Sequence, residues 1–424
     1  MKKTLNHTVI PWFILAVSLV LGYLCAFATE FTWSFTAALS LIFILAFFYR
    51  NNFGKPIVAT ARILLGAVFV FSGFVKGVDP LGTQYQIFDY FAAYNMVWAN
   101  PFAKLIALGL ITAEMIVGVA LILNIRIPFT AWITVLMMAF FTTTTLLDAT
   151  IFSDKISDCG CFGKAITLTN WQTFYKNIVL NIWLVILFFG RYRIRNTFSL
   201  KKEFLIASLT TILFFGFQLY NLRHLPVIDF LDWKVGVKLN PPRTEPVTFV
   251  FKYQHPETQE IREFGLQDLT AEITSTWKFI DRIEHDPNPP NLMIPIYDNR
   301  GVDGFEVSDF IADFSGYFFI VAIHNLEKTN YRNMPKIFDL VDYANQNGHE
   351  FMFLFDLNAS DEAIENFKQR VDRRDFNIYF SDNKSIKAIV RSNPGLILLH
   401  DGYVRGKWAW RDIPSVERIG RIIN

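Results

Sequence analysis

Long apolar runs fill the first half of the chain, whereas charged residues recur every few positions beyond about residue 222. A bilayer core about 30 Å thick takes roughly 20 apolar residues as helix. Seven runs have about this length, and the pattern predicts a membrane span in each of them: Ile10–Ala28, Trp33–Tyr49, Ile57–Val75, Pro101–Leu123, Pro128–Leu147, Trp171–Gly190 and Glu203–Leu222. We therefore expect a polytopic helical membrane domain followed by a water-soluble domain.

The distribution of Lys and Arg over the connections predicts the orientation in the membrane. The connections on one side are about twice as basic as those on the other. The more basic connections contain Lys2, Lys3, Arg50, Lys55, Arg126, Arg191, Arg193, Arg195, Lys201 and Lys202. The N-terminus is then cytoplasmic and, after an odd number of spans, the C-terminal domain is periplasmic, in the inner membrane of a bacterium.

The N-terminus allows a second interpretation. Met1–Lys3, an apolar core and Ala26-Phe27-Ala28 resemble a cleavable signal peptide. Cleavage there would not change the side predicted for anything downstream.

The segment Asp79–Asn100, between the third and fourth spans, also shows a helical pattern. Ile87, Phe88, Phe91, Ala92 and Tyr94 fall near one face of a helix. The pattern predicts an amphipathic helix, either lying at the periplasmic interface or packed on the bundle.

Charged residues inside spans need partners, because charge in a bilayer is costly. Arg62 and Glu114 are predicted to lie at similar depths in antiparallel spans, so an Arg62–Glu114 pair is feasible; otherwise Arg62 snorkels and Glu114 bonds within the bundle. Lys76 and Asp148 end their spans on the periplasmic side and could pair there, or act as two independent surface charges.

The most informative local feature is Asp158-Cys159-Gly160-Cys161-Phe162-Gly163, in the predicted periplasmic loop after the fifth span. Disulfides persist in that compartment, and Gly160 allows the unusual backbone angles that a pair spaced by one residue needs. Cys159 and Cys161 are thus either a thiol–disulfide exchange pair or a structural disulfide. Two thiolates without a nearby histidine fall short of a tetrahedral set, so we expect no metal site.

Composition narrows the classes further. Three cysteines are too few for a disulfide framework, and a net charge of +2 without a basic stripe does not suggest nucleic acid.

The soluble half begins with a β-rich connector, in which Val247–Tyr253 and Ile261–Leu266 suggest a hairpin. A βαβ-like pattern follows from about Asn291. The predicted strands are Leu292–Tyr297, Tyr317–Ile323, Phe351–Phe355, Ile378–Phe380, Leu396–His400 and Val404–Trp408, and the predicted helices are Met334–Asn347, Asp361–Val371 and Pro414–Ile423. Asp401-Gly402 is predicted as the turn of the last hairpin.

The membrane half resembles the DoxX-like membrane proteins. The resemblance rests on Arg62-Ile-Leu-Leu-Gly66, Phe71-Ser-Gly-Phe-Val-Lys76, Glu114 with Gly118, and the cysteine loop. The Cys-Gly-Cys-Phe-Gly segment is similar to the branch that includes the methylamine-utilisation protein MauE, and the two-part layout resembles DoxX-family proteins of Bacteroidota. The resemblance covers about residues 56–190 and implies a four-helix membrane core associated with redox or disulfide chemistry, with a quinone as a candidate cofactor by analogy alone.

The order of elements in the soluble half resembles the thioredoxin fold of membrane-tethered periplasmic proteins. That resemblance implies a cis peptide bond at Asn393-Pro394. The turn where such proteins carry Cys-x-x-Cys runs from His324 to Tyr331 without cysteine, so this domain is expected to dock a partner or cover the membrane core rather than exchange thiols alone.

The sequence thus predicts an α-helical polytopic membrane bundle of about seven spans with a DoxX-like four-helix core, and a periplasmic α/β thioredoxin-like domain. We expect a transmembrane hairpin (1–55), the core (56–200), a seventh span (201–223), the connector (224–290) and the degenerate thioredoxin-like domain (291–424).

Two functions remain open. One is a membrane thiol–disulfide oxidoreductase, partnered by a quinone or a periplasmic thiol protein, with Arg62, Lys76, Glu114 and Asp148 as a candidate polar network inside the membrane or at its interface. The other is a non-enzymatic scaffold or subunit of an envelope complex.

Overall fold

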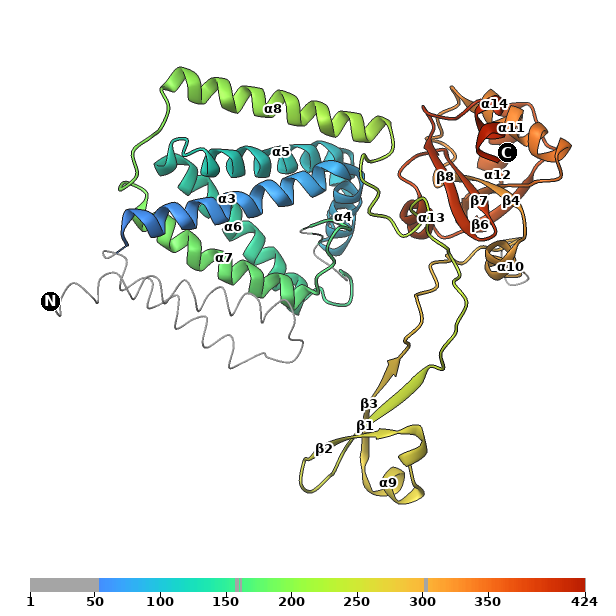
Figure 1. Ribbon diagram of the computed structural model, residues 1–424, viewed down its shortest axis with the longest axis horizontal. Coiled ribbons are helices and arrows are strands. Elements are labelled where there is room, and N and C mark those ends of the chain that lie inside the picture. The colour runs from blue at the N-terminus through green and yellow to red at the C-terminus, as the bar shows by residue number, and fades with distance from the viewer. Residues whose placement is uncertain (1–52, 157–159, 161, 301–303, 424) are drawn as a thin grey trace. The chain divides into compact units, whose positions relative to one another are not determined.

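A computed structural model describes residues 53–156, 160, 162–300 and 304–423 (Figure 1). The chain divides into two compact units, Met1–Phe230 and Leu231–Asn424. The predicted spans Ile10–Ala28 and Trp33–Tyr49 lie outside the described residues, as do Cys25, Cys159 and Cys161.

Helices long and apolar enough to cross a membrane occupy the other five predicted spans. They are α3 (Lys55–Val78), α5 (Ala103–Ile122, preceded by the 3-10 turn η2, Val97–Phe102), α6 (Ile127–Thr150), α7 (Asn170–Gly190) and α8 (Leu200–Arg223). Proline starts α3 and α6, and Thr169 and Gln172 form a capping box at α7. The chain is therefore a membrane protein, and five predicted spans are confirmed as helices.

Small residues allow α3 and α5 to cross closely. A Cβ added at Gly66 would lie 2.9 Å from the Gly118 carbonyl oxygen, and one at Gly73 would lie 3.1 Å from the Met115 amide nitrogen. Such contacts replace the hydrophobic driving force that membrane helices lack among apolar lipid tails. Helix α7 completes the core with Ile182, Ile186 and Leu187, which are fully buried.

The segment after α3 forms the helix α4 (Pro80–Ala93), whose first turn Asp79 caps by accepting from the Gly82 amide at 3.0 Å. Ile87, with Phe88 and Phe91, packs against Ala103 and Ala107 of α5. The predicted helix is thus present and packs on the bundle.

The second unit contains a five-stranded mixed sheet in the order β6-β5-β4-β7-β8. Strands β4, β5 and β6 are parallel, and β7 and β8 are antiparallel additions. The strands are β4 (Tyr317–Ile323), β5 (Glu350–Asp356), β6 (Asn377–Ser381), β7 (Gly395–His400) and β8 (Tyr403–Ala409). The helices of this region are α10 (Ser308–Asp313), α11 (Met334–Gln346), α12 (Asp361–Val371), α13 (Asn383–Ile389) and α14 (Val416–Ile423).

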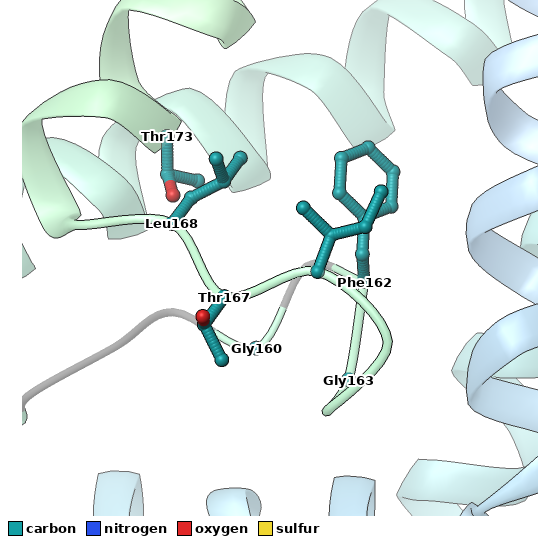
Figure 2. A pocket seen from close by; sticks show the side chains of 7 residues that line it. Gly160, Phe162, Gly163, Thr167, Leu168 and Thr173 are labelled. Atoms are coloured by element: carbon teal, nitrogen blue, oxygen red, sulfur yellow. The ribbon is translucent and has the colours of Figure 1, made fainter. Parts of the chain in front are cut away.

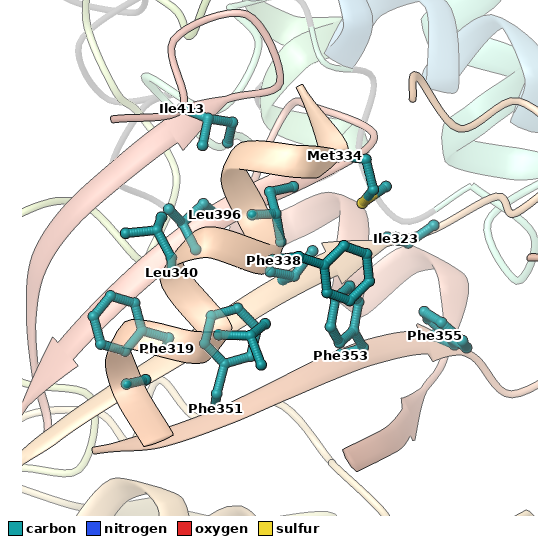
Figure 3. Close-up of a cluster of buried hydrophobic side chains, with 14 of the residues drawn as sticks. Phe319, Ile323, Met334, Phe338, Leu340, Phe351, Phe353, Phe355, Leu396 and Ile413 are labelled. Atoms are coloured by element: carbon teal, nitrogen blue, oxygen red, sulfur yellow. The ribbon is translucent and has the colours of Figure 1, made fainter. Parts of the chain in front are cut away.

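One apolar cluster joins this sheet to its helices. Met334, Phe338 and Leu340 of α11 meet Phe319, Phe353 and other strand residues, as Figure 3 shows. Phe353 and Leu354 of β5 point to opposite faces of the sheet and are both fully buried, as expected for a parallel strand covered on both faces.

Several local predictions for this unit are confirmed. Ser360 caps α12 by accepting from the Ala363 amide at 3.1 Å. Asp401 and Gly402 have φ angles of 52° and 74° in the β7–β8 turn, and the Asn393–Pro394 bond is cis.

The predicted strand Leu292–Tyr297 is wrong. Pro295 interrupts it and cannot donate to a ladder, and Tyr297 makes only isolated bridges, to Glu306 and Phe380. The Tyr297 amide and carbonyl groups exchange hydrogen bonds with those of Phe380, so the segment instead covers the β6 edge of the sheet.

The opposite edge of the same sheet is covered by residues 236–239. The Gly236 amide donates to the Val404 carbonyl at 2.8 Å, and the Val404 amide donates to the Val237 carbonyl at 3.0 Å. Trp233 is fully buried, and Lys407 donates to its carbonyl at 3.0 Å.

The part of the chain between these two edge segments forms a separate three-stranded antiparallel sheet in the order β2-β1-β3, with η3 (Leu266–Asp268) and α9 (Ala271–Thr276). The predicted hairpin is confirmed as β1 (Thr248–Gln254) and β2 (Ile261–Gly265). The sequence does not predict the third strand, β3 (Lys278–His285). Every side chain on this strand is exposed, and its residues lack the alternation of apolar and polar positions that marks a half-buried strand.

We expect Gly118→Ala to destabilise the membrane bundle and Gly109→Ala, on the same helix, to leave it intact. A Cβ at Gly118 would lie 2.6 Å from the Val70 amide nitrogen, whereas one at Gly109 meets nothing within 4 Å. Overpacking of this kind costs about 1–3 kcal/mol. Thermal unfolding of both variants in one detergent measures the difference, and equal midpoints would contradict the close crossing.

Candidate functional site

A buried ion pair joins α3 to α5. Lys76 Nζ donates to Glu114 Oε1 at 2.6 Å, and Ser72 Oγ donates to Glu114 Oε2 at 2.8 Å. Lys76 is 7% exposed and Glu114 is 1% exposed. Both carboxylate oxygens are thus satisfied, as a buried charge requires.

Of the two alternatives considered for Glu114, this arrangement rules out the pair with Arg62 and agrees with bonding inside the bundle. Arg62 donates to the carbonyls of Leu121 and Ile122, which end α5 and lack partners within that helix. Gly73 faces Met115 across the crossing, so Glu114 lies level with Ser72 and Lys76, roughly three turns away from Arg62.

Asp148 has a different partner from the one considered for it. The ion pair that the structure shows for Lys76 is with Glu114, whereas Asp148 Oδ2 accepts from the Tyr90 hydroxyl at 2.6 Å. Asn170 Nδ2 donates to the Asp148 carbonyl at 3.2 Å and to the Ile156 carbonyl at 2.8 Å. Asp148, which is fully buried, thus helps to fasten α4 and the start of α7 to the end of α6.

Polar residues also connect α6 to α7 inside the bundle. Asn181 Nδ2 donates to Thr142 Oγ1 at 2.9 Å, and Asn177 Nδ2 donates to Thr145 Oγ1 at 3.2 Å. Sequence analysis overlooked these residues. The signal was present, since two asparagines four positions apart lie on one face of an apolar helix.

Two glycines of the cysteine loop, Gly160 and Gly163, have left-handed backbone angles. Gly160 has φ +55° and Gly163 has φ +55°, and the Gly163 amide donates to the Gly160 carbonyl at 2.9 Å. The unusual angle predicted at Gly160 is therefore confirmed. A Cβ there would lie 2.0 Å from Gln86 Oε1, so the loop backbone lies against α4.

Two pockets meet at Phe162. The first, here the loop pocket, is shown in Figure 2 and is lined by Gly160, Phe162, Gly163, Ile166, Thr167, Leu168 and Thr173. The second, here the bundle pocket, is lined by Val68, Phe69, Ser72, Lys76, Glu114, Met138, Phe141, Phe162, Lys176, Asn177 and Leu180. Phe162 directly follows Cys161, so the residue next to a thiol belongs to the pocket that contains the ion pair.

The Phe162 ring is held from two sides. It meets the Phe71 ring edge-on, with centroids 5.4 Å apart, and Lys176 Nζ lies 4.4 Å from its centroid. Lys176 thus brings a second positive charge beside Lys76 to the bundle pocket.

Among the residues that the structure describes, no cluster of three or more His, Cys, Asp and Glu could hold a metal ion.

Side-chain hydrogen bonds from asparagines hold the turn after β4 in the second unit. Asn325 and Asn393 bond reciprocally through backbone and side chain, and Asn383 Nδ2 donates to the His324 carbonyl at 2.6 Å. Burial, together with the charge of Lys387, lowers the pKa of His324 to about 4. The turn holds a neutral histidine and no cysteine, since none follows Cys161 in the chain.

We expect single substitutions in the ion pair to destabilise the bundle more than the double substitution. Lys76→Met leaves the buried Glu114 carboxylate without its cation, and Glu114→Leu removes the carboxylate that Lys76 binds, at about 3–5 kcal/mol each. Thermal unfolding of both single variants, the double variant and the control Lys104→Met tests this, because Lys104 is an exposed membrane-helix lysine. Additive losses in the double variant would contradict the pairing.

Acid should destabilise the second unit through His324. The unfolded chain binds a proton on this histidine near pH 6.5, whereas the folded unit resists protonation until about pH 4. Stability is therefore lost as pH falls from 6.5 towards 4. Urea unfolding of the whole chain, followed by the strand signal in circular dichroism, should show a smaller loss in His324→Gln than in the control His285→Gln, whose histidine is exposed; identical pH profiles would disprove it.

Comparisons with known proteins agree with part of this description. Residues 54–190 match the family model described as methylamine utilisation protein MauE, which is about a third of the chain. The chain is also 28% identical over 160 residues to protein TlpB of Flavobacterium psychrophilum, an alignment that covers 36% of this chain and 42% of TlpB. The chain thus spans less than half of that relative's length. No solved structure matches it. The similarity to MauE predicted from the residues is confirmed over α3 to α7, and the likeness to DoxX stays a prediction.

Proposed function

We propose that this membrane protein takes part in thiol–disulfide redox chemistry, with Cys159 and Cys161 as the exchanging pair. The similarity to MauE covers the helices α3, α5, α6 and α7 together with the cysteine loop. Two cysteines spaced by one glycine can form a ring only with local distortion, and Gly160 has the positive φ that such a loop uses. A strained, exposed disulfide tends towards the higher potentials of exchanging pairs.

The observation that carries this proposal is the position of Phe162. It lies next to Cys161 in sequence and lines the bundle pocket with Lys76, Glu114 and Lys176. A cation near a thiol favours the thiolate, which is the attacking form. Lys76 and Lys176 are the two cations of this pocket.

The reaction is a two-electron exchange. A thiolate of a partner protein attacks the Cys159–Cys161 disulfide and forms a mixed disulfide; the second thiol of the partner resolves it, which leaves an oxidised partner and two reduced cysteines. Restoring the disulfide transfers two electrons and two protons to an acceptor, for which a quinone or the disulfide form of a second periplasmic thiol protein is the candidate. Glu114 and Lys76, which line the bundle pocket together with Phe162, are the candidate groups to exchange those protons.

The proposed location is the bacterial inner membrane, with the cysteine loop and the second unit in the periplasm. Arg191, Arg193 and Arg195 lie between the end of α7 and the start of α8. Short loops rich in Arg and Lys are typical of the cytoplasmic side. The loop from 151 to 169 lies at the opposite end of α7, and its basic residues are Lys155 and Lys164.

We assign the second unit a thioredoxin-like fold and a docking role. The parallel strands β4 and β5, flanked by the antiparallel pair β7–β8, support the fold. The turn at His324 has no thiol, so this unit contributes binding rather than exchange.

The lack of a thiol in the His324 turn favours the second candidate function, a non-enzymatic scaffold of an envelope complex. If the cysteines are structural, both units serve assembly alone. Purification in mild detergent separates the two: stable co-purifying subunits without redox turnover favour the scaffold.

Cys161→Ser should trap a partner as a mixed disulfide through Cys159. In this variant the Cys159 thiolate attacks the disulfide of the oxidised partner, the reverse of the exchange above, and the mixed disulfide lacks the Cys161 thiol that would resolve it. Non-reducing electrophoresis of membranes quenched with acid should show a reducible higher-mass band. Cys25→Ser is the matched control, because it removes a cysteine outside the loop and should show no band. Absence of the band in Cys161→Ser and in Cys159→Ser would sink the redox proposal.

A further inference from the structure

The bundle pocket combines an apolar wall with an unbalanced charge. Val68, Phe69, Met138, Phe141 and Leu180 supply apolar surface from α3, α6 and α7. The charged residues in its described lining are Lys76, Glu114 and Lys176. Two positive charges and one negative charge give the described lining a net charge of +1.

The polar groups of the pocket are not equally available to a ligand. Lys76 and Ser72 both donate to Glu114. The Asn177 amide donates to Thr145 and, at 3.4 Å, to the Phe141 carbonyl. A ligand rich in hydrogen-bonding groups would have to break these bonds.

Lys176 differs from them. Its ammonium group lies over the Phe162 ring, and no carboxylate among the described residues forms an ion pair with it. The side chain is half-buried in the second turn of α7. A ring quadrupole attracts a cation but does not neutralise it, so the charge would be stabilised further by an anion within the apolar pocket.

We propose that the bundle pocket binds an amphiphilic anion, with a singly charged oxyanion head at Lys176 and an apolar chain that runs from the pocket into the bilayer past Phe141 and Leu180, which are half-buried. A single uncompensated cation selects a single negative charge. The apolar wall selects a chain that enters from the bilayer. This binding does not depend on the redox proposal.

The same head chemistry has two sources in a membrane, the carboxylate of a free fatty acid and the phosphodiester of an anionic phospholipid. Dodecanoate and dilauroylphosphatidylglycerol represent them, and dodecanol is the neutral match for dodecanoate. Binding of each probe to the purified full chain is measured by native mass spectrometry from a neutral detergent.

We expect the full chain to bind dodecanoate, dilauroylphosphatidylglycerol or both at least tenfold more tightly than dodecanol. The probe retained identifies the source. Lys176→Gln should lose at least tenfold of the affinity for that anion and none for dodecanol. Lys104→Gln, which removes an exposed charge outside the pocket lining, should lose neither.

A second variant tests the apolar chain without changing charge. Leu180→Trp fills the pocket and should weaken binding of the anion and of dodecanol alike. The inference is overturned if dodecanol binds as tightly as both anions, or if Lys176→Gln and Lys104→Gln bind equally. Repeating the measurement with Cys159→Ser separates it from the redox proposal, because anion binding should persist when exchange is abolished.

Discussion

The membrane unit depends on one interaction, the buried ion pair between Lys76 and Glu114. A charge inside a bilayer is tolerated only when it is paired and hydrogen-bonded, and here Ser72 completes the shell of the carboxylate. The pair can form only because α3 and α5 approach through glycines, which places Lys76 within reach of a residue in the middle of the neighbouring helix. Close packing and charge burial therefore require each other in this bundle.

The same constraint determines where chemistry can occur. The pair lies below the end of the bundle where α4, the cysteine loop and the start of α7 meet, and Phe162 belongs both to that loop and to the pocket beside the pair. Asp148 and Tyr90 fix α4 to α6 at this end, and Asn170 holds the beginning of α7. At the other end of the bundle Arg62 satisfies the final carbonyls of α5, which is a structural task. The polar residues of the membrane unit thus divide into those that fasten helix ends and those that surround the pocket.

Hydrophobic length predicted the five described spans to within a few residues, and β4 has the predicted bounds because it is strongly apolar. Helix α12 also has the predicted bounds, because Ser360 marks its start as a cap. Pairing within the membrane was not predictable in the same way. The depth of Arg62 and Glu114 was judged from approximate span ends, whereas their true register depends on where Gly66, Gly73 and Gly118 let the helices cross. Ser72 and Tyr90 escaped notice because single hydroxyl groups are common in apolar helices. The Leu292–Tyr297 prediction weighed apolar content above Pro295.

The central claim is that Cys159 and Cys161 are an exchanging pair rather than a structural bridge, and their midpoint potential in intact membranes tests it most directly. Membranes equilibrated in thiol–disulfide buffers, then alkylated with a mass label, give the reduced fraction of the loop cysteines at each potential. The account predicts a two-electron transition well above about −300 mV, in the range of catalytic disulfides. A pair that stays oxidised below about −300 mV, as structural disulfides do, would contradict it.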